Sequence, residues 1–128
     1  MQGMRKSNLL YGLPQAMSTS GPLVVVEGPS DVWRLGSNAV ALFGKSISVP
    51  PVALLVSHFA GRPIVVVLDH DAQREAQSAV TAIRQSRTNW RDSAPVILGF
   101  PPEGAKDFGE TTRDAAWAAV WKSLSQRV

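Results

Sequence analysis

The sequence predicts an α/β domain in which a four-stranded parallel sheet is flanked by helices. Short apolar runs rich in β-branched residues recur along the chain, and helical patterns bounded by glycine or proline lie between them. Such runs are typical of strands that are buried on both faces, as in parallel sheets covered by helices. The regular alternation of strand and helix indicates right-handed crossover connections.

The four apolar runs are the predicted strands, and they lie at residues 23–27, 39–43, 64–68 and 95–99. A polar stretch rich in turn-forming residues precedes the first strand. We therefore expect an N-terminal lead-in and linker over residues 1–22 and the domain itself over residues 23–128.

Helices are predicted in the intervals. Pro29 suits the first turn of a helix that ends near Gly36, and Pro51 suits one that ends near Gly61. The next helix has five apolar residues on one face: Ala72, Ala76, Ala79, Val80 and Ile83. The last begins with a capping-box pattern, and its predicted buried side holds Trp117, Val120, Trp121 and Leu124.

Composition narrows the class of protein. The 128 residues are 45% hydrophobic and 18% charged, which is enough apolar surface for a folded core. Cysteine is absent, so disulfides and thiolate–zinc sites are excluded. Neither a signal-peptide pattern nor a membrane-spanning apolar run is present, so we expect a cytoplasmic protein with no membrane partner.

The acidic residues are grouped, although the formal net charge is +3. Three groups contain all but Asp92: Glu27 with Asp31; Asp69, Asp71 and Glu75; and Glu103, Asp107, Glu110 and Asp114. Because neighbouring carboxylates repel one another, this grouping favours a bound cation.

Three of these acids follow predicted strands directly. Glu27 ends the first strand, and Asp69 and Asp71 follow the third. Functional groups of open parallel sheets gather at the carboxyl ends of strands, so these carboxylates converge if the two strands are neighbours. Hard oxygen ligands of this kind suit Mg²⁺ or Mn²⁺ rather than zinc.

Structural roles remain open for two acids. Asp71 is also placed to cap the helix that begins near Ala72. Asp31 is as compatible with a salt bridge to Arg34 or Arg62 as with a position facing the metal. Glu27 fits a capping role poorly, because glutamate is a weak N-cap residue.

Two segments together carry a family resemblance: Val24-Val25-Val26-Glu27-Gly28-Pro29-Ser30-Asp31 and Val66-Val67-Leu68-Asp69-His70-Asp71. They resemble the two motifs of the Toprim domain, which DNA primases, type IA and type II topoisomerases and several nucleases share. The resemblance implies that Glu27, Asp69 and Asp71 are metal-binding and catalytic positions. It also implies DNA or RNA and nucleotides as partners.

The resemblance is strongest to bacterial primases. Residues 10–16 are similar to that family's lead-in to the first strand, and residues 38–46 to its second strand and glycine turn. Residues 102–107 resemble its acidic loop, which implies that Asp107 also reaches the metal.

The chain departs from the primase pattern at several positions. His70 replaces a glycine, Arg74 and Glu75 stand where another glycine is usual, and Phe108 replaces a proline. The zinc-binding module, template-gripping half and helicase-binding tail of a full primase are not in this sequence. It is therefore a fragment, a subunit that needs a helicase or the missing primase modules as partners, or a small stand-alone protein.

Two lysines are candidates for phosphate contact, Lys45 in the loop after the second strand and Lys106 beside Asp107. Lys45 is not part of a P-loop, because Ala39 stands where that motif needs glycine. The leading hypothesis is primase-like, metal-dependent nucleotidyl transfer. The alternatives are a small Toprim nuclease and a non-catalytic module that binds nucleic acid or a replication partner.

Overall fold

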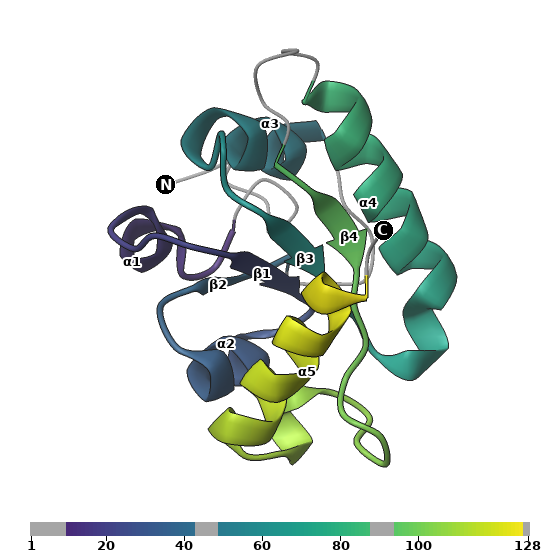
Figure 1. Ribbon diagram of the computed structural model, residues 1–128. Helices are drawn as coiled ribbons and strands as arrows, with labels where there is room; N and C mark the ends of the chain where they lie inside the picture. The colour runs from purple at the N-terminus through teal and green to yellow at the C-terminus, as the bar shows by residue number, and fades with distance from the viewer. Residues whose placement is uncertain (1–9, 43–48, 88–93, 127–128) are drawn as a thin grey trace, which may run out of the picture.

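A sheet of four parallel strands lies between two layers of helices (Figure 1). The computed structural model describes residues 10–42, 49–87 and 94–126. The strands are β1 (Leu23–Val26), β2 (Ala39–Ala41), β3 (Ile64–Val66) and β4 (Val96–Leu98), in the order β2-β1-β3-β4. The predicted fold class is confirmed.

Five α-helices and two 3₁₀ turns are found in the described part of the chain. They are α1 (Leu13–Met17), α2 (Pro29–Leu35), α3 (Val49–His58), η2 (His70–Ala72), α4 (Gln73–Ser86), η3 (Phe108–Glu110) and α5 (Arg113–Ser125). Helices α3 and α4 cover one face of the sheet, and α2 and α5 cover the other (Figure 1). None of the helices in these described ranges is long and apolar enough to cross a membrane.

The central strands are apolar throughout because both of their faces are covered. Val25 and Val66 face the core beneath α3 and α4, whereas Val24, Val26 and Val65 face the core beneath α2 and α5. All five side chains have no exposed surface. The two opposite cores explain why the strand sequences are continuous apolar runs rather than alternating ones.

Helix boundaries follow the predicted signals closely. Pro29 begins α2, and Gly36 ends it. The φ of Gly36 is 95°, a backbone conformation that residues with a Cβ adopt only at a cost in energy. Thr112 caps α5, since its hydroxyl accepts a hydrogen bond from the Ala115 amide at 3.1 Å. The five predicted face residues of α4 and its preceding turn are all buried.

One helix-face prediction is wrong. Trp121 was expected on the buried side of α5, but its side chain is 55% exposed. The buried line of this helix runs through Ala116 and Val120, and Trp121 lies about 100° further round the helix than Val120. Trp117 is partly buried and donates its indole N–H to the Leu35 carbonyl at 2.8 Å.

The segment before β1 packs onto the sheet. Tyr11 forms an antiparallel bridge with Ala41 at the outer edge of β2, with backbone hydrogen bonds of 3.0 Å in both directions. Leu10 and Ala16 are buried in the core on the α3 and α4 side. These contacts cover part of an edge strand that would otherwise expose its backbone groups.

Three arginines bind main-chain carbonyls near the amino ends of the strands. Arg87 is buried and donates to the carbonyls of Phe59, Arg62 and Ala94, at 2.9 to 3.0 Å. Arg62 binds the carbonyls of Gly21 and Ala16. The third, Arg84 of α4, donates to the Val96 carbonyl at 2.8 Å. These side chains fasten loops together at the sheet edge opposite to the acids.

Arg87→Met should lower the free energy of unfolding by about 2 to 3 kcal/mol, because three carbonyls lose a charged donor in a buried setting. Urea unfolding monitored by circular dichroism measures the change. The matched control is Arg74→Met, which replaces an exposed arginine in the first turn of α4, the helix that Arg87 follows, and should stay within about 0.5 kcal/mol of the native chain. Equal stability of the two variants would show that the Arg87 contacts contribute little.

Candidate metal site at the carboxyl edge of the sheet

The strand order creates a switch point between β1 and β3. The chain passes from β1 through α2 to β2 on one side, whereas β3 and β4 extend the sheet on the other. The two strands pair in parallel, with Val24 opposite Val65 and Val25 opposite Val66. Ligands of open α/β sheets bind outside the carboxyl ends of strands at such a switch point.

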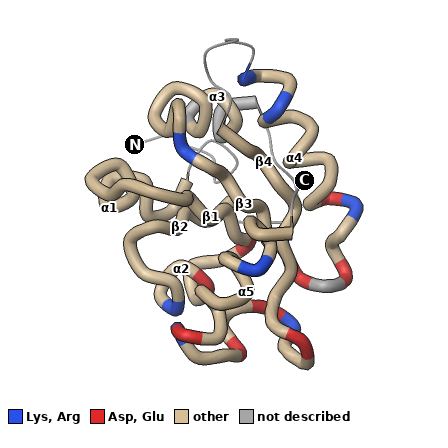
Figure 2. The backbone as a smooth tube through the Cα atoms, in the orientation of Figure 1, with Lys and Arg blue, Asp and Glu red and all other residues tan. Residues whose placement is uncertain are grey.

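The predicted acids are found at this edge. Glu27 follows β1 directly and is half-buried, and Asp69 lies three residues after the end of β3 and is buried. The carbonyl of Asp69 accepts hydrogen bonds from the Ala72 amide at 2.9 Å and from the Gln73 side chain at 3.2 Å, which fix the turn. Figure 2 shows acidic segments gathered around this edge of the fold, below the sheet in that view.

A third acid, Asp31, lies close enough to Asp69 and Asp107 for their charges to repel its carboxylate. Burial raises the pKa of its carboxyl; hydrogen bonds from the Gly109 and Gly28 amides oppose this rise, and repulsion from Asp107 and Asp69 adds to it. The bond from Gly109 is 2.9 Å long and that from Gly28 is 3.4 Å. Asp31 thus connects the start of α2 to η3. Of the two roles left open for it, the structural one is found, with main-chain amides as partners in place of Arg34 or Arg62.

Asp107 is positioned by the turn that follows it. Phe108, which occupies the place of the expected proline, is buried in the core beneath α2 and α5 and anchors this turn. A Cβ on Gly109 would approach both the Asp107 carboxylate and the Ser30 hydroxyl to 3.2 Å, so these two groups flank the glycine closely. The departure from the primase pattern at Phe108 therefore serves packing and keeps Asp107 beside Asp31.

Lys106 places a positive charge at the same edge. Its ammonium group lies 3.9 Å from the Asp69 carboxylate, and its side chain is 60% exposed. The buried aspartate thus already has a cation beside it, on a side chain long and exposed enough to move aside. Lys45, the other predicted phosphate contact, lies outside the described residues.

Asp71 lies in the 3₁₀ turn η2 and is exposed. The N-cap of α4 is Ala72, and neither η2 nor α4 has a side-chain capping bond. The capping interpretation of Asp71 therefore has no support, and the residue lies in the turn at this edge, two residues beyond Asp69.

The acidic edge suits an ion such as Mg²⁺, which keeps much of its water shell, better than an ion that needs to be surrounded by protein ligands. Within the described ranges, no three acidic or histidine side chains already surround a point that would hold a metal. Mg²⁺ commonly takes one or two carboxylates and completes its shell with water and phosphate oxygens. The features that favour such an ion are the hard oxygen donors and the repulsion of Asp31 by Asp69 and Asp107, which a cation would relieve. The Lys106 ammonium beside Asp69 would have to move aside for it.

Together, the four-stranded parallel sheet, its strand order and the helices on both faces give a Toprim-like α/β fold. No protein-family model and no curated protein matches the sequence. Solved structures of bacterial primase catalytic cores do match, and they confirm the resemblance to the primase branch at the level of structure.

Three of these structures show the extent of the match. The DnaG catalytic core superposes with a TM-score of 0.75 at 26% identity, covering 98% of this chain and 42% of its own. The DnaG primase catalytic domain bound to single-stranded DNA gives 0.74 at 26% identity, with 96% and 40% covered. The E. coli primase catalytic core gives 0.73 at 24% identity, with 98% and 41% covered, which shows the fold alone. The chain thus spans about two-fifths of the cores it matches.

The stability of the domain should depend on the ionisation of Asp31. Because its pKa is raised in the folded state, its contribution is fully present below the ordinary value of 3.8 and is lost as pH rises through the raised pKa. Asp31→Asn cannot ionise, so its free energy of unfolding should rise relative to the native chain as pH increases from about 4 to about 8. Urea unfolding at several pH values measures this difference, and a constant difference would contradict the inferred burial and repulsion.

Proposed function

We propose that this chain is a primase-like Toprim domain that performs or assists metal-dependent nucleotidyl transfer on nucleic acid in the cytoplasm. The observation that carries the proposal is the position of Glu27 and Asp69 just beyond the carboxyl ends of two neighbouring strands, at the switch point of a primase-like fold. Asp71 and Asp107 lie in the turns that follow β3 and β4.

Glu27, Asp69, Asp71 and Asp107 would hold Mg²⁺ or Mn²⁺. When bound, such an ion neutralises phosphate charge and stabilises the attacking and leaving oxygens. Asp69 and Asp71 come from one turn and suit the role of gripping the ion. Glu27 arrives from a separate strand, and we assign it to accept the proton of the attacking hydroxyl.

Lys106 would contact phosphate. Its ammonium group balances the charge of Asp69 when no metal is present, and an arriving cation makes that balance unnecessary. The lysine is then able to turn toward a phosphate oxygen. This exchange keeps the buried carboxylate compensated in both states.

The parts of a primase core beyond this chain would supply template binding. The matched length is about two-fifths of those cores, so positioning of two nucleotides falls to partner domains or to a helicase-associated assembly. A hydrolytic variant of the same chemistry uses water in place of a 3′-hydroxyl. The same carboxylates would then cleave DNA or RNA.

Metal should stabilise the fold through the acidic edge. Mn²⁺ at about ten times its Kd should add about 1.4 kcal/mol, equivalent to a rise in Tm of roughly 4 to 7 °C. Thermal unfolding monitored by circular dichroism measures the shift. It should disappear in the double variant Asp69→Asn with Asp71→Asn and persist in Asp114→Asn, which alters an exposed acid of α5. A shift that survives in the double variant would place the metal elsewhere.

The activity itself is tested with labelled DNA or RNA, nucleotides and Mg²⁺ or Mn²⁺, scoring extension of the strand against its degradation. Glu27→Gln should lower turnover by at least about 100-fold while keeping much of the metal-dependent rise in Tm, because the amide retains one oxygen but accepts no proton. Asp71→Asn should weaken metal binding first. Equal loss of metal binding in both variants would make Glu27 a third ligand only, and retained turnover in Glu27→Gln would remove it from the reaction.

Partner domains enter the same assay as a variable. Extension that appears only when the remaining part of a primase core is added would identify a dependent subunit. Degradation without extension would select the nuclease alternative. If neither extension nor degradation occurs under any of these conditions, the non-catalytic binding module is the remaining alternative.

A further inference from the structure

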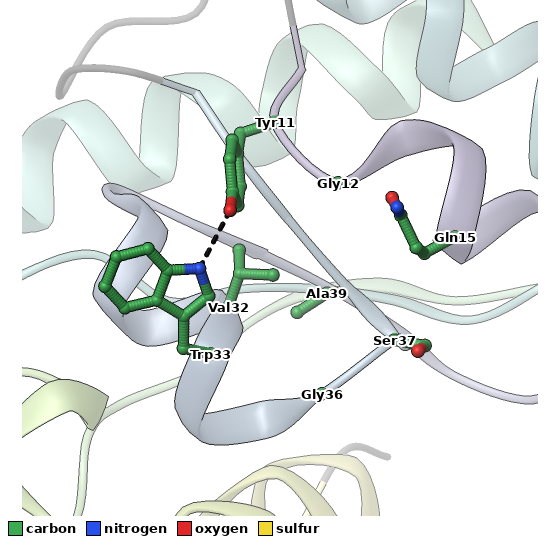
Figure 3. A pocket seen from close by; sticks show the side chains of 8 residues that line it. All are labelled: Tyr11, Gly12, Gln15, Val32, Trp33, Gly36, Ser37 and Ala39. Carbon is green, nitrogen blue, oxygen red and sulfur yellow. Dashed lines mark hydrogen bonds between the residues drawn. The ribbon is translucent and has the colours of Figure 1, made fainter.

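A cavity of about 330 Å³ lies beside the outer edge of β2, between α1 and α2. Tyr11 and Trp33 form one wall, and Gln15 and Ser37 lie on the opposite side of the opening (Figure 3). The volume is at the lower end of the roughly 300 to 1,000 Å³ typical of small-ligand pockets. It therefore suits a single ring system with its sugar rather than a helix or a peptide strand.

The aromatic wall is held in a fixed orientation. The indole N–H of Trp33 donates to the Tyr11 hydroxyl at 2.8 Å (Figure 3). Tyr11 is itself fixed by its backbone bridge to Ala41. The Trp33 side chain is nevertheless 65% exposed, so its ring offers an uncovered aromatic surface. Nucleobases stack on such surfaces with little dependence on sequence.

The rest of the lining suits an uncharged heterocycle. Gln15 offers both a donor and an acceptor, and Ser37 offers a hydroxyl, which are the groups that bind the edge of a base. None of the eight lining residues, all within the described part of the chain, is an acid, lysine, arginine or histidine. A second cavity, next to α5, includes Glu103, whose carboxylate would oppose a nearby phosphate.

Two arginines lie near the part of α2 that carries Trp33. Arg113 at the start of α5 donates to the carbonyls of Arg34 and Trp33 at 2.9 and 3.1 Å, which places its guanidinium beside Trp33. Arg34 is exposed on the next position of α2. Figure 2 shows basic positions where the end of α2 meets the start of α5. A phosphodiester that leaves the aromatic wall would meet these two cations.

Helix α2 connects this cavity to the acidic edge. Its first residue, Pro29, follows the Glu27-Gly28 segment, and Trp33 lies four residues later, about 6 Å along the helix. One helix thus has its first turn next to Glu27 and the aromatic wall of the cavity in its second turn.

We propose that the cavity between α1 and α2 binds one base of a single-stranded nucleic acid, stacked on Trp33, with Arg34 and Arg113 on its backbone. The inference rests on the proposed function to the extent that this strand is the one whose phosphates reach the acidic edge. It names a base-binding position outside the carboxylate site.

Binding of a fluorescently labelled single strand of about 12 nucleotides, followed by anisotropy in EDTA, tests the inference independently of catalysis. Trp33→Ala should weaken binding by about 5- to 100-fold, and Trp33→Phe should retain most of the affinity because phenylalanine still stacks. The matched control is Trp121→Ala, which removes another exposed tryptophan and should change the affinity less than about twofold. Gln15→Ala, at an exposed position of α1, should weaken binding without affecting folding.

Several results would overturn the inference. They are no measurable single-strand binding by the native chain, unchanged binding in Trp33→Ala, or an equal loss in Trp121→Ala. Thermal unfolding of each variant establishes that it is folded. Weaker binding in Trp33→Ala, together with neither extension nor cleavage by the native chain alone or with the remaining part of a primase core, would support the base site and contradict the proposed function. Extension by the native chain, together with unchanged binding in Trp33→Ala, would support the proposed function and contradict the base site.

Discussion

The parallel pairing of β1 with β3 is the constraint on which the site depends. It places two strands that are far apart in sequence side by side and sends their connections in opposite directions across the sheet. Side chains just beyond these strands must then meet at one edge. Both strands are wholly apolar, and the first acid comes directly after the end of β1 at Glu27 and three residues after the end of β3 at Asp69.

Much of the rest of the fold serves to hold that edge in place. The loop after β4 returns Asp107 to the other acids, and Phe108 anchors it in the core while Gly109 binds Asp31. The Asp31 carboxylate is thus used as a structural acceptor at the cost of repulsion from its neighbours. A cation at this edge would relieve that repulsion.

The sequence was sufficient for the strands, for most helix boundaries and for the acidic edge, because each depends on local patterns. The signals for a strand or a helix end depend on residues close by in the sequence. Examples are the valine runs, Pro29 and Gly36 at the ends of α2, and Thr112 at the start of α5. The partners of Asp31 could not be read in the same way, since Gly109 lies 78 residues away. The exposure of Trp121 depends on how α5 is rotated against the sheet, and the cavity at Trp33 exists only because α1 folds back onto β2.

The arginines bound to main-chain carbonyls have a consequence for how a polyanion would approach. Although the net charge is +3, Arg62, Arg84 and Arg87 lie toward the amino ends of the strands, across the sheet from the carboxylates. Charges separated by more than a Debye length of about 8 Å are largely screened at physiological ionic strength. With only Arg34, Arg113 and Lys106 as its backbone contacts, a bound strand would displace few condensed counterions, and its affinity would fall gently as salt is added. Long-range attraction contributes little to such an encounter, and stacking, these short-range contacts and metal must hold the complex once it forms.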